Sequence, residues 1–532
     1  MNELPIITIL TLLPLAGGVI ALALGRNNRA WARHAAIGFG GLALVIAVGM
    51  WLGYDAASGE LGFEERHAWV PSLNIEYRVA ADGLGVLMLV LTALVTLMAI
   101  VASGDFWKRV EDTAAAGSGY GSPLYYALIL FLQAGLFGTF TALNFFHWFI
   151  FWELSLVPAF FLIRLWGGFQ RSEAATQFFV YTMVGSIALL LSFLALFLST
   201  GEFDFTRLAE LGRKGELIPA LAAKLGWFDL TTQQLGALIF CGALLGFAVK
   251  VPLLPFHTWL PATYTEAPTP VTMLLTGVMS KMGVYGFVRI LLPIFGGVMH
   301  WQTVRTILLG LAAATVVFSA CAAFAQKDLK RILAYSSINH LGYCLLAVFA
   351  VATYQADVQA PAVEKASALN GVLLQMFNHG LTAATLFWFV GLIEKRSGGL
   401  RGLEDFGGLR KIAPVFCGLM GIAWFSSLGL PGLNGFVGEF LIFRGAFALA
   451  PWAAAFSVLG LLVTAIFILT ILQRVFNGPL NEKWSAWPDL TVRERVFAAI
   501  PIALMFVLGV YPQLVLGVVN ETVVGMVERM GF

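Results

Sequence analysis

The sequence predicts an all-α polytopic membrane protein with about fourteen transmembrane helices. Only 12% of the 532 residues are charged, about half the share in soluble globular proteins, while 59% are apolar. Apolar runs of roughly 20 residues, the length that spans a bilayer, recur along the whole chain. The net charge of +2 provides no basic field that would attract a nucleic acid. This composition excludes a soluble enzyme, a disordered chain and a nucleic-acid binder.

The predicted spans follow one another with mostly short connections. The first apolar run lacks a basic flank and a small-residue cleavage site, so we interpret it as a retained span and not a signal peptide. The longest connection, 200–232, is charged and could hold a short surface helix. The spans are expected at 4–24, 35–54, 82–102, 124–143, 145–165, 175–199, 233–254, 268–292, 305–324, 331–353, 366–393, 413–443, 453–473 and 497–519.

The distribution of lysine and arginine predicts the orientation of the chain. The connections on one side, beginning with the short basic loop at 25–34, carry nineteen of these residues, and the opposite side with both termini carries eleven. Because positive residues concentrate on the cytoplasmic side, the basic side is expected to be cytoplasmic or its equivalent. Lys327, Lys330 and Arg331 belong to this side and are interpreted as topology charges.

Four charged side chains fall well inside predicted spans: Glu153, Lys250, Lys281 and Glu439. A charge in mid-membrane costs about 2.5–3.5 kcal/mol on insertion scales, and such residues usually mark ion pathways or pair with one another. Static ion pairs that only hold helices together are the alternative interpretation. Because the four residues are spread over four spans, a proton pathway is favoured, with Glu153 as the natural partner of Lys250.

Prolines and glycines interrupt two of these spans and predict discontinuous helices 7 and 12. Pro252 and Pro255 follow Lys250, and Gly429-Leu-Pro431-Gly432 precedes Glu439. The breaks are about 180 residues apart, which suggests two inverted five-helix repeats within one membrane domain, an arrangement typical of transporters. The repeats are expected at 124–292 (helices 4–8) and 305–473 (helices 9–13), with 1–110 (helices 1–3) before them and 497–519 (helix 14) after them.

Two histidines in polar stripes of apolar spans are further candidates. His340 and His379 lie among Ser, Asn, Gln and Thr side chains, and an imidazole can relay a proton near neutral pH. An inert, hydrogen-bonded histidine is the alternative for each. The other histidines considered are interpreted as structural, and the four cysteines are too scattered for a zinc or iron–sulfur site. Those histidines are His34, His67, His147 and His300.

The chain resembles the antiporter-like subunits of respiratory complex I, which are related to Mrp-type cation/proton antiporters and membrane-bound hydrogenases. The resemblance covers almost the whole chain and is specific when its motifs are taken together. These are Phe151-Trp-Glu153 with Leu156-Val-Pro158, Lys250-Val-Pro252, Pro255-Phe-His-Thr-Trp-Leu-Pro261, Glu266-Ala-Pro-Thr-Pro270, Lys281-Met-Gly-Val-Tyr-Gly286, Ala334-Tyr-Ser-Ser, Gly429-Leu-Pro-Gly432 and Gly438-Glu439.

Within the family, the M-type subunits are most similar to this chain. They have glutamate in the second broken helix, as at Glu439, where the L- and N-type subunits and the Mrp homologues usually have lysine. One departure is that Ala262-Thr263-Tyr264 stands where many M-type chains have Asp-Ala-His. A proton-uptake role is therefore not assigned to this loop, and a divergent hydrogenase-linked or cyanobacterial-type complex stays open.

The resemblance implies a half-channel mechanism and a place in a larger complex. A proton is taken up from the cytoplasmic side, the Glu153–Lys250 pair gates it, Lys281 carries it to the centre, and His340 and His379 relay it to Glu439. No cofactor or metal is expected in this chain, since FMN, iron–sulfur clusters and quinone belong to the parent NADH:quinone oxidoreductase.

The resemblance also implies partners and a location. The expected partners are L-, N- and K-like membrane-arm subunits, the redox arm, membrane lipid and protons, without nucleic acid. The expected location is the bacterial inner membrane with periplasmic termini, or a thylakoid membrane in a cyanobacterial-type complex. The alternative function is that of an Mrp-type cation/proton antiporter subunit.

Overall fold

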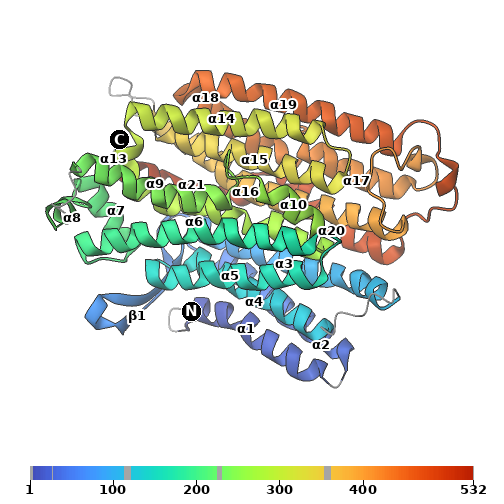
Figure 1. Ribbon diagram of the computed structural model, residues 1–532, viewed down its shortest axis with the longest axis horizontal. Helices are drawn as coiled ribbons and strands as arrows, with labels where there is room; N and C mark the ends of the chain where they lie inside the picture. Colours follow the sequence, from blue (N-terminus) through green and yellow to red (C-terminus); the bar gives the residue numbers. More distant parts are fainter. Residues whose placement is uncertain (1–3, 27, 113–120, 225–230, 353–360, 531–532) are drawn as a thin grey trace.

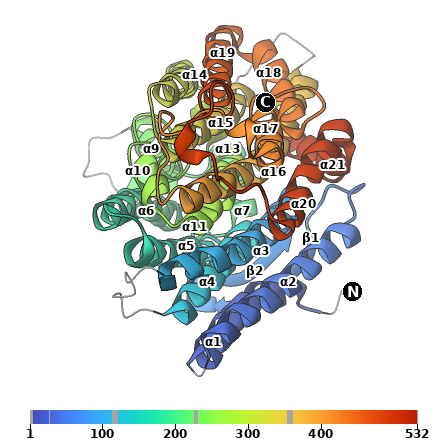
Figure 2. The same cartoon turned by 90° about the vertical axis from the view of Figure 1, so that its right-hand side faces the viewer.

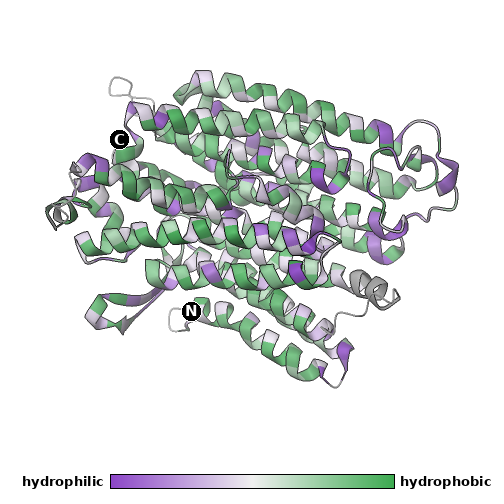
Figure 3. Ribbon diagram, in the orientation of Figure 1, coloured by the Kyte–Doolittle hydropathy of each residue, from purple (hydrophilic) through white to green (hydrophobic). Residues whose placement is uncertain are grey.

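Long helices lying side by side make up the protein (Figure 1). The computed structural model describes residues 4–26, 28–112, 121–224, 231–352 and 361–530. Within these ranges, twelve helices are long and apolar enough to cross a membrane. Hydrophobic residues follow the helices and hydrophilic residues gather at their ends (Figure 3). The prediction of a polytopic helical membrane protein is confirmed.

The spans follow the expected order closely. The unbroken ones are α1 (Ile6–Gly25), α2 (Arg29–Gly53), α3 (Gly83–Asp112), α4 (Ser122–Thr141), α5 (Phe145–Trp166), α6 (Arg171–Thr200), α14 (Gln302–Phe324), α15 (Leu329–Val351), α16 (Pro361–Arg396) and α19 (Pro451–Ile471). Seen along the bundle, α1 and α2 lie at one edge, α14, α18 (Asn434–Leu449) and α19 at another, and α15 and α16 in between (Figure 2). In α15 and α16, 94% of the most apolar 18-residue stretch is buried within the chain.

Both predicted helix breaks are present. In the first, α9 (Thr232–Lys250) ends at Lys250, and α10 (Trp259–Glu266) begins after a turn. In the second, α17 (Pro414–Ser427) is followed by α18 (Asn434–Leu449) after a turn in which Gly429 and Gly432 have φ of +77° and +92°. Glycine is suited to both positions because it has no Cβ to clash at positive φ.

Side chains satisfy backbone groups that the breaks release. Trp259 Nε1 donates to the carbonyl of Val249 at 3.0 Å, next to the first break. At the second break, Asn378 donates its amide to the carbonyl of Asn434 at 2.5 Å, and Asn434 donates back to the carbonyl of Asn378 at 3.3 Å. Interrupted backbone is tolerated at membrane depth where neighbouring groups meet its hydrogen bonds in this way.

Two spans differ from the sequence prediction in detail. The eighth consists of α11 (Thr269–Leu274), α12 (Lys281–Gly286) and α13 (Leu292–Met299), joined by π-helical turns at Leu275–Met279 and Phe287–Leu291. The continuous helix predicted at 497–519 is wrong, because α20 (Val492–Val510) and α21 (Gln513–Met530) are bent by 62° at Tyr511-Pro512. Proline has no backbone N–H to continue a helix and clashes with the preceding turn.

The connections add a small amount of other structure. The 200–232 connection holds α7 (Phe205–Lys214) and α8 (Pro219–Lys224), as expected, while the hairpin β1 (Gly62–Val70) and β2 (Ile75–Ala81) was missed. The hairpin, α7, α8 and both termini lie at the same end of the bundle (Figure 1). Short turns of 3-10 or π-helix are at Pro71–Leu73, Leu409–Lys411, Leu472–Phe476 and Glu482–Trp484.

An ion pair fixes the hairpin to α7. Arg78 Nη1 lies 2.6 Å from Asp204 Oδ2, and the other carboxylate oxygen caps α7 by accepting from the backbone N–H of Thr206 and Arg207. Burial raises the pKa of Asp204, but hydrogen bonds from Thr206 and Arg78 outweigh it and hold this pKa below its usual value. The carboxylate therefore stays ionised and joins two connections at this end of the bundle.

Candidate functional site

Lys281 is the fully buried starting point of a chain of titratable side chains. It begins α12, between the two π-helical turns, and is 0% exposed. Its Nζ lies 2.7 Å from Nδ1 of His379 on α16, donates to the carbonyl of Thr276 and is 3.4 Å from Ser280 Oγ. A charged lysine can only donate, so Nδ1 of His379 then accepts and its Nε2 carries the proton. Single π turns of this kind are frequent at functional sites.

The chain continues from His379 through His340 to Glu439. The two imidazole rings have their centroids 5.1 Å apart, and Nδ1 of His340 lies 3.1 Å from Oε1 of Glu439. Gln375 donates to this carboxylate oxygen at 3.2 Å, and Ser427 at the second helix break is 3.1 Å from Nε2 of His340. All four titratable groups are buried, so their contacts are with one another and with polar protein groups.

Glu153 and Lys250 lie at the first broken helix without a direct ion pair. Lys250 is 3% exposed, and its ammonium lies 4.7 Å from the ring centroid of Trp152, a cation–π contact. Glu153 interacts electrostatically with Lys250, but one of its buried carboxylate oxygens has no hydrogen-bond partner among the described residues. Glu153 and Lys250 therefore interact electrostatically but do not form a direct ion pair.

The structure does not join the two halves of the predicted pathway by a contact. Within the described ranges, no hydrogen bond or ion pair links Lys250 to Lys281. Their helices pack closely, since a Cβ on Gly283 would come within 2.4 Å of Val251. Lys281, His379, His340 and Glu439 form one cluster, and Glu153 with Lys250 forms another.

Charged groups that the sequence did not predict to lie inside the protein are also buried. Lys330, interpreted above as a topology charge, is 2% exposed and lies 3.2 Å from Glu394. Arg289 on the eighth span is paired with Asp82, which is 2% exposed, at the end of the bundle that holds the termini. A run such as Lys327-Asp-Leu-Lys330-Arg331 is typical of an exposed loop, so only the packing of α15 against α10 and α16 reveals that Lys330 is internal.

The remaining histidine and cysteine predictions concern groups outside these clusters. His147 packs against aromatic rings, among them Tyr77 at 4.7 Å and Phe151 at 5.0 Å between centroids. All four cysteines are unbridged, and the described part of the chain has no group of three His, Cys, Asp or Glu side chains placed to hold a metal ion.

Comparison with known proteins identifies the family. Residues 142–466 match the family described as "NADH:quinone oxidoreductase/Mrp antiporter, TM". The chain belongs to this family. NADH-quinone oxidoreductase subunit M of Rhodobacter capsulatus is 31% identical, over 98% of this chain and 96% of that protein.

Two further proteins are similar to this member of the NADH:quinone oxidoreductase/Mrp antiporter family. F(420)H(2) dehydrogenase subunit M of Methanosarcina mazei is 33% identical, over 99% of this chain and 100% of that protein. A chain of respiratory complex I from Thermus thermophilus, solved with bound NADH, superposes with a TM-score of 0.81 at 26% identity, over 99% of this chain and all of that one.

Proposed function

We propose that this chain is the M-type, proton-translocating membrane-arm subunit of an NADH:quinone oxidoreductase. The observation that carries the proposal is the buried cluster of Lys281, His379, His340 and Glu439 beside an interrupted helix. Lys281 lies 2.7 Å from His379, the rings of His379 and His340 have their centroids 5.1 Å apart and are tilted by 39°, and His340 lies 3.1 Å from Glu439. Such spacing suits stepwise proton transfer between side chains.

In the proposed mechanism, the six residues act in two stages. Glu153 and Lys250 act as the gate, because moving the Glu153 carboxylate changes the electrostatic environment that decides whether the buried lysine keeps its proton. Lys281 then passes a proton to His379, from which it reaches His340 and Glu439 for release. The geometry supports this order of the two histidines, since His379 contacts Lys281 and His340 faces Glu439.

The redox chemistry is placed outside this chain. FMN, iron–sulfur clusters and quinone would be held by other subunits, and L-, N- and K-like subunits and the redox arm would be the partners. The membrane would be the bacterial inner membrane, with the end that holds α7, α8 and both termini facing the periplasm. The two inverted repeats at 124–292 and 305–473 would supply the two broken helices.

A complex with another electron donor is the second candidate. It is favoured by the 33% identity to a subunit of an F(420)H(2) dehydrogenase. An Mrp-type antiporter is a third possibility within the family, although Glu439 favours a redox-driven complex. Purification of the tagged chain from its native membrane distinguishes these candidates. Co-purified flavin- and iron–sulfur-containing partners that oxidise NADH support the NADH:quinone oxidoreductase, and partners that oxidise F(420)H(2) support the complex with another electron donor. Co-purification of antiporter subunits alone would refute both.

The site assignment is tested in the assembled complex. Glu153→Ala and Lys250→Ala are expected to abolish most proton pumping and the coupled quinone reduction, while Glu482→Ala, an exposed glutamate in a connection, leaves both unchanged. Full pumping by a properly assembled Glu153→Ala complex would refute the gate.

A further inference from the structure

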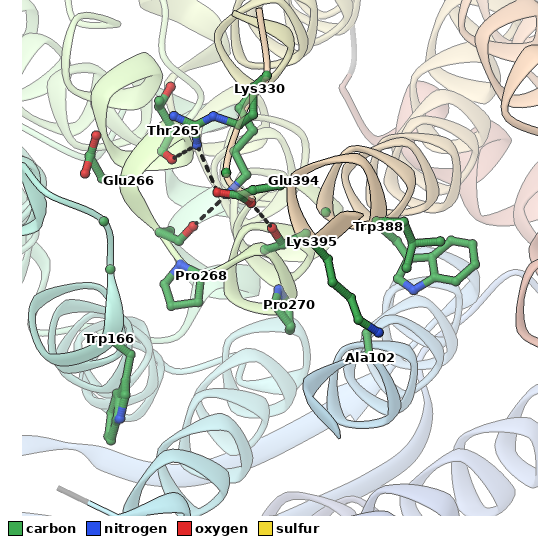
Figure 4. A pocket seen from close by; sticks show the side chains of 18 of the residues that line it. Ala102, Trp166, Thr265, Glu266, Pro268, Pro270, Lys330, Trp388, Glu394 and Lys395 are labelled. Carbon is green, nitrogen blue, oxygen red and sulfur yellow. Dashed lines mark hydrogen bonds and ion pairs between the residues drawn. The ribbon is translucent and has the colours of Figure 1, made fainter. Parts of the chain in front are cut away.

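A cavity of about 290 Å³ lies at the end of the bundle opposite the termini. It is bounded by the α5–α6 connection, the joint between α10 and α11, the first turn of α15 and the last turn of α16. Figure 4 shows Glu394 and Lys330 pointing toward each other at its wall, with Thr265, Pro268 and Pro270 of the joint beside them. Its charged lining residues are Glu266, Lys330, Glu394, Lys395 and Arg401.

Glu394 is the centre of the interactions in this wall. Its Oε2 lies 3.2 Å from Lys330 and accepts from Thr269 Oγ1 at 3.3 Å, while its Oε1 is 3.5 Å from Arg401. Arg401 is in turn paired with Asp328 at 3.1 Å. Two cations and two anions therefore balance one another, and a proton added to Glu394 would leave the group with a net positive charge.

A stripe of hydroxyl groups leads from Glu394 to Lys281. Thr269, Thr272, Thr276 and Ser280 follow at three- and four-residue intervals, which places them on one face of the helix. Thr269 contacts Glu394, and Thr276 Oγ1 lies 3.0 Å from Ser337 Oγ on α15. Ser280 lies 3.4 Å from the Lys281 ammonium, and Thr272 and Thr276 are 0% exposed.

Polar side chains of this kind are unusual among the apolar groups of a buried helix, and each hydroxyl can both donate and accept a hydrogen bond. The stripe begins at the cavity and ends at the lysine that starts the cluster described above. Ala262-Thr263-Tyr264 lies within α10 and contains no acid or histidine, and Tyr264 is hydrogen-bonded to Thr276 and Ser280 of the stripe. Glu394 provides an acid at the same joint from a different helix.

We propose that this cavity is where protons enter the chain and that Glu394 is the first side chain to accept them, passing them along the hydroxyl stripe to Lys281. The inference rests on the proposed translocation function and adds to it an uptake site. Lys330 and Arg401 hold the Glu394 carboxylate in place. They also donate to the carbonyls of Ala267 at 3.3 Å and Thr265 at 3.1 Å, so they keep the α10–α11 joint next to the acid.

A carboxylate that accepts protons and one that only anchors helices respond differently to substitution. Glu394→Gln keeps the size of the side chain and one of its two acceptor oxygens but cannot bind a proton at this site. Glu394→Asp keeps the acid and shortens it. Glu404→Gln is the matched control, because Glu404 is paired with Lys327 at the same end of the protein but is 65% exposed.

The experiment measures proton pumping and quinone reduction by the purified, assembled complex in liposomes. A positioned proton-transfer group typically contributes about 10²–10⁴-fold, so we expect Glu394→Gln to lower pumping at least about tenfold, with substantial recovery in Glu394→Asp and no change in Glu404→Gln. Pumping by Glu394→Gln within about twofold of the unsubstituted complex would overturn the proposal. Equal losses in Glu394→Gln and Glu394→Asp would also overturn it, because they would indicate an anchoring role.

A second pair of variants decides the question if Glu394→Gln does not assemble. Thr276→Val removes a buried hydroxyl of the stripe with little change in shape, and Thr306→Val removes an exposed hydroxyl from α14. A loss of pumping in Thr276→Val alone supports the route, and unchanged pumping in both refutes it. Failure of the unsubstituted complex to pump would instead refute the proposed function, so the two failures are distinguishable.

Discussion

Replacing His379 by glutamine tests the central relay most directly. His379 is the residue that Lys281 contacts, with 2.7 Å between Nζ and Nδ1, and its ring is the nearest imidazole to His340. Glutamine has a similar size and can still accept from the lysine, so the packing of α16 should change little. It cannot take up a proton on one side and release one from the other, as imidazole does.

The expected loss follows from the geometry. Proton transfer requires donor and acceptor within about 2.6–3.2 Å or one bridging water, and no other titratable side chain in the described residues is hydrogen-bonded to Lys281. Removal of a positioned proton-transfer group typically lowers a rate by about 10²–10⁴-fold, which corresponds to about 2.7–5.4 kcal/mol in activation free energy. We therefore expect pumping by His379→Gln to fall at least about a hundredfold.

The assay is proton uptake into liposomes by the purified complex, followed with a pH-sensitive dye during quinone reduction. His147→Gln is the control, because His147 is also a buried histidine but packs among aromatic rings away from the relay. A correctly assembled His379→Gln complex that pumps at more than half the rate of the His147→Gln complex would refute the relay.

Three further predictions concern stability and assembly. Arg289→Met should destabilise the purified complex by about 3–5 kcal/mol, because it leaves Asp82 buried without its partner, and thermal melting should show that Asp82→Asn restores part of the loss. Gly435→Ala should prevent assembly, since a Cβ at this position would lie 1.9 Å from the Ser426 carbonyl oxygen. Gly418→Ala is the control and should assemble normally, because a Cβ there would have no atom within 4 Å. Equal yields of the two variant complexes on a native gel would contradict this reasoning. The low pKa of Asp204 means that its contribution to stability is present above the ordinary carboxyl value of 3.8 and is lost as the pH falls below it. Asp204→Asn should therefore lower the melting temperature at neutral pH, with a difference from the unsubstituted protein that shrinks on acidification.

Local sequence signals were sufficient for most of the spans and for both broken helices. Pro252 and the Gly429-Leu-Pro431-Gly432 run act within a few residues, so their effect on the helix does not depend on distant packing. Pro512 is the same kind of signal, and applying the rule to it would have found the bend between α20 and α21.

Features that depend on which helices pack together could not be predicted. The order of His379 and His340 between Lys281 and Glu439 is set by the positions of α15, α16 and α18 around α12, and nothing in the spacing of these residues along the chain determines it. Burial of Lys330 likewise requires that the first turn of α15 reach the joint between α10 and α11. The sequence prediction therefore identified the members of the cluster but not their neighbours.

The two π-helical turns determine where the eighth span can change its length. Each closes hydrogen bonds to the fifth residue along, so it holds about one more residue per turn than the α-helix around it. Loss of one residue from Leu275–Met279 would let the turn revert to α-helix and would leave Lys281 on the face that meets His379, because the deleted residue is the extra one of the turn. Loss of one residue from the α-helix at Thr269–Leu274 would instead rotate the parts on its two sides by about 100° relative to each other. Single-residue deletions in this span are therefore expected to be tolerated within the π-helical turns and excluded outside them.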